Sequence, residues 1–280
     1  MDLADDRLGP RLESALVERR LTLVYQPKFS YASGRVAGVE ALMRWDEPGI
    51  GPVSPTHFIP LAERNGLIDG LTGWGLREAM RQWAGWRDGG LQLELAFNIS
   101  PTTLHDRDFP DDVQRLCREA GMPPEMLTLE LTEGATQEAV RLMDTLSRFR
   151  IKGMRVALDD FGTGYSSLLQ LRQLPFSELK IDRWFVEDAV RSADAALVVR
   201  SIIDLAHGLS LHVTAEGVAT AEQFALLQEF GCDQAQGEFV AAPMAGAALV
   251  PWLMQRGEPL HALWSDARAR TLPVQPNEAM

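Results

Sequence analysis

The stretch "RVALDDFGTGYSSL", residues Arg155–Leu168, decides the fold class of this chain. An apolar, β-type run ends in two adjacent carboxylates, Asp159 and Asp160, and a loop with Gly162 and Gly164 follows at once. Adjacent acids repel each other, so this strand end indicates a positively charged partner. Within a strand the two side chains would face opposite sides. At its end the glycines let the chain turn, so that both carboxylates can face the same way.

Similar β-type runs recur along the chain, and helical patterns separate most of them. Eight runs are found, at Leu21–Pro27, Val36–Leu42, Leu93–Ile99, Leu127–Thr132, Arg155–Asp160, Glu178–Asp182, Leu211–Val218 and Gln234–Val240. Strands that alternate with helices predict parallel βα units, and eight of them fit one (β/α)₈ barrel. Only "KFSYASGR" separates the first two runs, which is too short for a helical crossover. The sequence therefore predicts an α/β fold, a modified TIM barrel with an antiparallel first strand.

Composition bounds the class of protein. The 280 residues are 46% hydrophobic, which is enough for a sizeable core, and no run approaches the roughly 20 apolar residues of a membrane span. The charged N-terminus lacks a signal-peptide core, and Cys117 and Cys232 show no metal-type spacing, so we expect a cytoplasmic protein. The net charge of −12 argues against binding DNA or RNA, but a bound metal would still allow a small phosphate ligand.

The chain shows no linker that would divide it. We expect one barrel domain over residues 1–256, which includes an amphipathic helix within the first 20 residues, and a loosely ordered tail over residues 257–280.

Polar side chains fall near the ends of seven of the eight runs. They are Glu40, Asn98, Glu130, Asp159 with Asp160, Lys180, Glu216 and Gln236. Catalytic groups of such barrels lie at the C-terminal ends of the strands, on one face. Each residue alone has an ordinary explanation, such as a surface salt bridge or a helix cap, but their joint placement predicts a site. Buried carboxylates need partners, and one lysine cannot neutralise five of them. Oxygen ligands alone favour Mg²⁺ or Mn²⁺.

Several motifs occur in one order along the chain. They are "EALMRW" (40–45), "FNISPTTL" (97–104), "LDDFGTGYSSL" (158–168), "LKIDRWFV" (179–186) and "CDQAQGEFVAAP" (232–243). With these motifs the chain resembles the EAL-domain family of cyclic di-GMP phosphodiesterases. The resemblance runs from about Leu12 to Val250 and implies hydrolysis of cyclic di-GMP to linear 5'-pGpG by two Mg²⁺ or Mn²⁺ ions.

The resemblance also implies roles for individual residues. One metal would be held by Glu40, Asn98, Glu130 and Asp159, and the other by Asp159, Asp160 and Glu216. Lys180 would orient the attacking water, and Glu216 would act as a general base. Glu133 would steady the loop after "DDFGTG", which couples to homodimer formation. Contacts to guanine and phosphate would come from Gln26, Leu42, Arg44 and Gln236.

Two positions depart from the family pattern. The family continues "AEGV" with a second glutamate where this chain has Ala219, and an aromatic residue is common where it has Glu238. The loss of a carboxylate at Ala219 implies reduced turnover. Two alternatives follow, namely a non-hydrolytic cyclic di-GMP receptor or a protein-interaction module on a degenerate barrel. A glycosidase ranks last, because it would need no Asn98 or Lys180 in the cluster.

Overall fold

The computed structural model describes residues 5–18, 20–133, 139–162 and 168–256. The predicted tail over residues 257–280 lies outside this part of the chain, so the domain boundary at residue 256 stays a prediction. The expected N-terminal helix is α1 (Asp5–Val17), and its apolar side chains at Leu8, Leu12 and Ala15 are buried.

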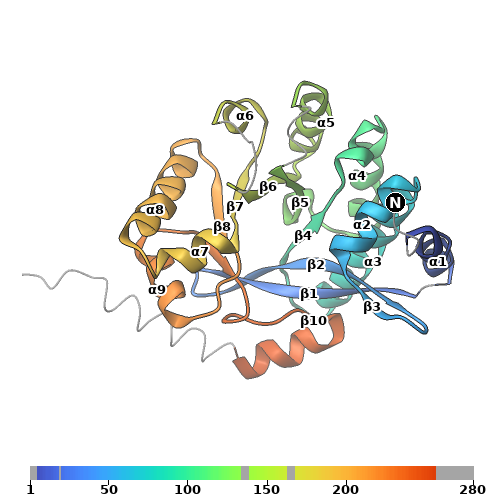
Figure 1. Cartoon of the computed structure of the whole chain (residues 1–280), viewed down its shortest axis with the longest axis horizontal. Helices are drawn as coiled ribbons and strands as arrows, with labels where there is room; N and C mark the ends of the chain where they lie inside the picture. The colour runs from blue at the N-terminus through green and yellow to red at the C-terminus, as the bar shows by residue number, and fades with distance from the viewer. Residues whose placement is uncertain (1–4, 19, 134–138, 163–167, 257–280) are drawn as a thin grey trace, which may run out of the picture.

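Eight of the described strands close into a barrel at the centre of the molecule (Figure 1). They are β1 (Leu21–Ser30), β2 (Arg35–Glu47), β4 (Glu94–Asn98), β5 (Leu127–Thr132), β6 (Arg155–Phe161), β7 (Glu178–Ile181), β8 (His212–Ala215) and β9 (Gln234–Gln236). Strand β1 is antiparallel to both of its neighbours, β2 and β9, whereas the pairs from β2 through β4 to β9 are parallel. The predicted modified TIM barrel with an antiparallel first strand is therefore confirmed.

Helices surround the strands (Figure 1). They are α3 (Ile68–Asp88), α4 (Phe109–Ala120), α5 (Ala139–Ile151), α6 (Leu168–Gln173), α7 (Arg183–Ala189), α8 (Ala193–Gly208) and α9 (Ala221–Glu229), with short 3₁₀ turns at η1 (Pro101–His105) and η2 (Pro124–Met126). The layer between strands and helices is the main core, where Leu95, Leu129 and Val213 are fully buried. None of the described helices is long and apolar enough to cross a membrane.

The β1–β2 hairpin extends beyond the barrel. Strand β4 pairs with β2 only over residues 38–41, and the rest of β2 pairs with β1 and with β3 (Gly51–Val53). A two-residue strand, β10 (Met244–Ala245), adds to the other edge of β1. The sequence did not predict β3 or β10. On this extension α1, α2 (Pro55–Arg64) and Trp45 build a second apolar core. Because β2 continues past its pairing with β4, Glu40 lies in the middle of β2 and yet near the end of the part that belongs to the barrel.

Candidate functional site

Lys180 lies at the centre of the barrel mouth. Its side chain on β7 is fully buried, and its ammonium group contacts four carboxylates that come from four different parts of the barrel. The distances from Nζ are 2.7 Å to Glu216 Oε1, 2.9 Å to Glu130 Oε2, 3.2 Å to Asp159 Oδ1 and 3.6 Å to Glu40 Oε2. Four of the strand-end carboxylates that were predicted to meet therefore lie around one cation.

A second buried lysine, which was not predicted from the sequence, lies behind this group. Lys28 on β1 is 4% exposed, and its Nζ donates to Glu130 Oε1 at 2.7 Å. The predicted strand ended at Pro27, which placed Lys28 in the hairpin connection. In the structure β1 continues to Ser30, because Pro27 pairs with Val39 without breaking the strand. The signal that would have found it is a lysine two residues from Gln26, on the same face of a strand.

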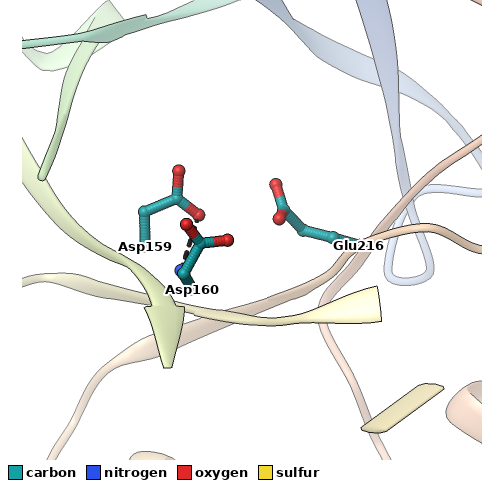
Figure 2. A group of neighbouring side chains, drawn as sticks. All are labelled: Asp159, Asp160 and Glu216. Carbon is teal, nitrogen blue, oxygen red and sulfur yellow. Dashed lines mark hydrogen bonds between the residues drawn. The ribbon is translucent and has the colours of Figure 1, made fainter. Parts of the chain in front are cut away.

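The end of β6 turns both of its aspartates toward the mouth. The sequence predicted this turn at Gly162 and Gly164, but Asp160 itself has φ of 56°, and the pairing with β7 shifts register between Leu158 and Phe161. Aspartate tolerates this left-handed conformation better than most residues do. Gly162 also has a positive φ, whereas Gly164 lies outside the described residues. Figure 2 shows the carboxylates of Asp159 and Asp160 side by side, with Glu216 pointing toward them from the opposite side.

Amide side chains fix the other wall of the mouth. Gln236 on β9 donates from Nε2 to Glu40 Oε2 at 2.6 Å and to Gln26 Oε1 at 3.0 Å. Asn98 on β4 donates from Nδ2 to Glu40 Oε1 at 2.6 Å, so its carbonyl oxygen is the atom that it can offer to a cation. Both oxygens of Glu40 are thereby held in a fixed orientation.

The carboxylates at the mouth differ in their affinity for protons. Burial raises the pKa of Glu40 to about 7, that of Glu216 to about 8 and that of Asp160 to about 6, in each case with a further rise from neighbouring carboxylates. Burial acts on Glu130 in the same direction, but the ammonium groups of Lys180 and Lys28 outweigh it and hold the pKa at about 2. Two lysines therefore keep one carboxylate firmly ionised and leave the others short of positive charge.

The mouth opens into a cavity of about 540 Å³. Its lining includes seven acidic residues, namely Glu40, Asp159, Asp160, Asp182, Glu187, Glu216 and Glu238. Among the described lining residues the one cationic side chain is Arg183, which the sequence analysis did not single out. Such a cavity repels phosphate unless further positive charge enters it.

The remaining predicted residues divide into two groups. Gln26, Leu42 and Gln236 line the cavity, and so do Ala219 and Glu238. Arg44 does not line it; its Nη1 donates to the carbonyl oxygen of Met43, on the part of β2 that has left the barrel.

Glu133 is buried and is not among the residues that line the cavity. Its Oε2 accepts a hydrogen bond of 2.9 Å from the backbone N–H of Gly162. This contact lies within "DDFGTG" itself, whereas the loop that Glu133 was expected to steady begins after Gly164, outside the described residues.

The oxygen donors fit a hard divalent cation. Asp159, Asp160 and Glu216 each offer a carboxylate oxygen, and these atoms lie within 4.8 Å of one another. This is the predicted ligand set of one metal. In the predicted set of the other, the ammonium of Lys180 bridges Glu40, Glu130 and Asp159. A surplus of carboxylates over lysines, without nitrogen or sulfur donors among these residues, is the chemistry that Mg²⁺ and Mn²⁺ prefer.

A closed barrel with an acid-lined cavity at the carboxyl ends of its parallel strands defines the general class, a modified TIM barrel with its site at the usual mouth. The EAL domain family matches residues 10–243, and the chain belongs to this family. It is 42% identical over 237 residues to the cyclic di-GMP phosphodiesterase PA2567 of Pseudomonas aeruginosa, a match that covers 84% of this chain and 40% of that protein. The chain thus spans less than half the length of this relative.

Solved structures agree with this assignment. The phosphodiesterase of MucR from Pseudomonas aeruginosa, in complex with cyclic di-GMP, is 40% identical with a TM-score of 0.81, and the match covers 87% of this chain and 99% of that one. The EAL enzyme Bd1971, bound to cAMP and cyclic di-GMP, is 29% identical with a TM-score of 0.84, and the match covers 90% of this chain and 69% of that one.

Proposed function

We propose that this chain hydrolyses one phosphodiester bond of cyclic di-GMP to give linear 5'-pGpG, with two Mg²⁺ or Mn²⁺ ions held at the barrel mouth. The observation that carries the proposal is the ring of carboxylates around Lys180, at the strand ends of a barrel whose relatives are named cyclic di-GMP phosphodiesterases. One ligand set is Glu40, Asn98, Glu130 and Asp159, and the other is Asp159, Asp160 and Glu216.

The chemistry divides between the ions and the protein. Bound cations would lower the pKa of water and neutralise charge on the phosphoryl oxygens. Lys180 would orient the attacking water, because its ammonium already lies among the ligand carboxylates. Glu216 would take the proton, because its carboxylate contacts Lys180 Nζ at 2.7 Å and so lies next to the group that would hold the water.

The ligand would lie in the acidic cavity. Gln26, Leu42 and Gln236 would contact guanine and phosphate, and their position in the cavity lining supports this role. Arg183 lines the same cavity and is the better placed arginine. Arg44 uses one of its five N–H donors on the Met43 carbonyl and would contact the ligand with the others.

The test is incubation of the protein with cyclic di-GMP and either Mg²⁺ or Mn²⁺, followed by chromatography for pGpG. We expect product with either ion, no product in excess chelator, and recovery when metal is restored. Turnover that is undiminished in excess chelator would exclude a metal-dependent site.

Ala219 favours one alternative, a receptor that binds cyclic di-GMP without cleaving it. The residue lines the cavity, but it has no carboxylate to contribute. Calorimetry with cyclic di-GMP in Ca²⁺ separates the two functions, because the larger Ca²⁺ is expected to support binding better than catalysis. A receptor would bind in Ca²⁺ and give no pGpG in Mg²⁺ or Mn²⁺, whereas an enzyme would bind in the first condition and cleave in the others.

We further propose a homodimer in the cytoplasm. Large apolar side chains are exposed on two helices that contact each other, with Trp184 of α7 at 62% and Leu197 of α8 at 63%. Glu133 would couple this surface to the site, since it holds Gly162 next to the β6 aspartates. We propose the cytoplasm because Cys117 and Cys232 are both buried free thiols, which is typical of a reducing compartment.

A further inference from the structure

Lys28 is a buried cation without an assigned role. It lies on β1, between Gly38 of β2 and Gln236 of β9, and its side chain points into the barrel. Within the described part of the chain, the residues that line the mouth cavity do not include it. It therefore cannot act on a ligand in that cavity directly, and its effect must pass through the groups that it contacts.

Those groups are two buried glutamates at different depths of the barrel. Lys28 Nζ lies 2.7 Å from Glu130 Oε1 and 3.8 Å from Glu178 Oε1. Glu178 is also held by Thr214, whose hydroxyl donates to it at 2.6 Å. A polar column thus leads from the mouth into the barrel interior, and Lys28 joins its two halves.

Glu130 carries one lysine on each oxygen. Lys28 holds Oε1, and Lys180 holds Oε2 at 2.9 Å. The two contacts are unequal, because Lys180 also contacts Glu216, Asp159 and Glu40, whereas the other acid within reach of Lys28 is Glu178. With a cation bound beside Glu130, Lys180 would still have other carboxylates to contact, and Lys28 would remain the group that holds Oε1.

We infer that Lys28 is a positioning residue: it fixes the carboxylate of Glu130 so that Oε2 faces the barrel mouth and is ready to bind a divalent cation. The inference rests on the proposed function, in which Glu130 is a metal ligand. Groups that orient metal ligands typically affect metal affinity by about 10–100-fold when they are removed.

Net charge alone predicts the opposite change in metal affinity when Lys28 is removed. Removal of a positive charge near a cation site should strengthen cation binding by Coulomb's law. A purely structural role for Lys28 should leave metal affinity unchanged in any variant that folds. The sign of the change therefore separates orientation from bulk charge.

The experiment is calorimetric titration of Mn²⁺ into the full chain and its variants. Lys28→Met should bind Mn²⁺ about 10–100-fold more weakly than wild type. Because this variant leaves two buried carboxylates short of a counter-charge, the double variant Lys28→Met with Glu178→Gln is measured beside it, and thermal unfolding without metal checks that both fold. Glu178→Gln alone is the matched control and should keep wild-type affinity, since Lys28 still holds Glu130.

Activity provides the second measurement. At saturating Mn²⁺ the KM for cyclic di-GMP of the double variant should stay within about 2-fold of wild type, while half-maximal activity should need about 10–100-fold more metal. Equal or tighter Mn²⁺ binding by the double variant overturns the role of Lys28 and leaves the proposed function standing. Absence of Mn²⁺ binding by wild type overturns both.

Discussion

At the scale of single residues, the barrel mouth contains more carboxylates than lysines. Lys180 is shared by four carboxylates, and burial raises the pKa of most of them, so without metal the mouth retains protons that the unfolded chain would release. Protons and metal ions therefore compete for the same oxygens. This competition connects stability, metal affinity and pH.

The first prediction concerns the metal-free protein. The folded-state pKa values of Glu40, Glu216 and Asp160, at about 7, 8 and 6, lie above their unfolded values. The native state thus binds more protons than the unfolded state between about pH 4 and pH 8, and stability falls as pH rises through this window. We expect thermal unfolding at pH 8 to occur roughly 5–10 °C below that at pH 5.

Two controls follow from the same argument. Excess Mn²⁺ should raise the unfolding temperature more at pH 8 than at pH 5, because it replaces protons that are scarce there. The variant Glu40→Gln with Glu216→Gln should show a flatter dependence on pH. A metal-free protein that becomes more stable from pH 5 to pH 8 would show that these carboxyls do not retain their protons.

The second prediction concerns Ala219, which is exposed and lines the cavity. Ala219→Glu restores the carboxylate that the family pattern has there and should lower the metal concentration for half-maximal rate. One charge-assisted contact is worth about 1.5–3 kcal/mol, or roughly one to two decades in affinity.

The matched control is Ala221→Glu, which adds the same charge at the first turn of α9 outside the cavity lining. It should leave the metal requirement unchanged. Metal titrations of all three proteins at saturating cyclic di-GMP provide the measurement. An unchanged or higher requirement in Ala219→Glu would show that repulsion of the phosphate ligand outweighs the restored contact.

At the scale of elements, short connections after the strands aim the site residues. Glu216 follows β8 directly. The next residue, Gly217, has a positive φ of 64° and packs against Arg183, the first residue of α7. A Cβ on Gly217 would lie 2.2 Å from the Cβ of Arg183. The glycine is therefore required both for its conformation and for its small size, and it couples Glu216 to the cavity arginine.

The third prediction compares two glycines. In Gly217→Ala the backbone would be strained by its positive φ, and the new Cβ would collide with Arg183. The variant should lose about 2–5 kcal/mol of stability together with most of the activity. Gly231→Ala has a similar φ of 78° but meets no atom within 4 Å, so it should lose only about 1–2 kcal/mol and keep the activity. Denaturant unfolding and the pGpG assay measure both. Equal losses in the two variants would show that the contact with Arg183 relaxes without consequence.

The sequence predicted those features that depend on local pattern. Their positions near the ends of the β-type runs placed Glu40, Glu130 and Lys180 at one mouth, and the short connection after the first run predicted the antiparallel hairpin. It could not predict where β2 leaves the barrel, which separates Arg44 from the cavity, since that depends on how far β4 extends. Lys28 was missed because a proline normally ends a strand, whereas β1 accommodates Pro27.

At the scale of the whole molecule, exposed apolar surface predicts self-association. Trp184 and Leu197 are more than half exposed on α7 and α8, and Val198 is exposed at 45%. The two helices contact each other, and large exposed apolar side chains on neighbouring elements commonly mark an interface between proteins. The helix α7 also carries Arg183 and Glu187 of the cavity lining, so this surface lies next to the site.

The fourth prediction concerns Trp184→Glu. A charge at this position should prevent burial of the patch, so sedimentation should show a dimer for wild type and a monomer for the variant at the same concentration. Val17→Glu is the control, because Val17 is 78% exposed on α1, in a different part of the chain, and should leave the dimer intact. A variant Trp184→Glu that remains dimeric would place the interface elsewhere.

The reversed strand β1 has a consequence for the order in which the molecule assembles. It closes the barrel by pairing with β9, and Gln236 thereby bonds to Gln26, 210 positions away, and to Glu40, 196 positions away. Contacts over such sequence separations form slowly, because a large loop must close before they gain anything. During synthesis β1 can pair with β9 only after residues 234–236 have left the ribosome. The mouth is therefore among the last parts of the barrel to become complete, and chains that stop before β9 would carry the acids without the closed barrel that orders them.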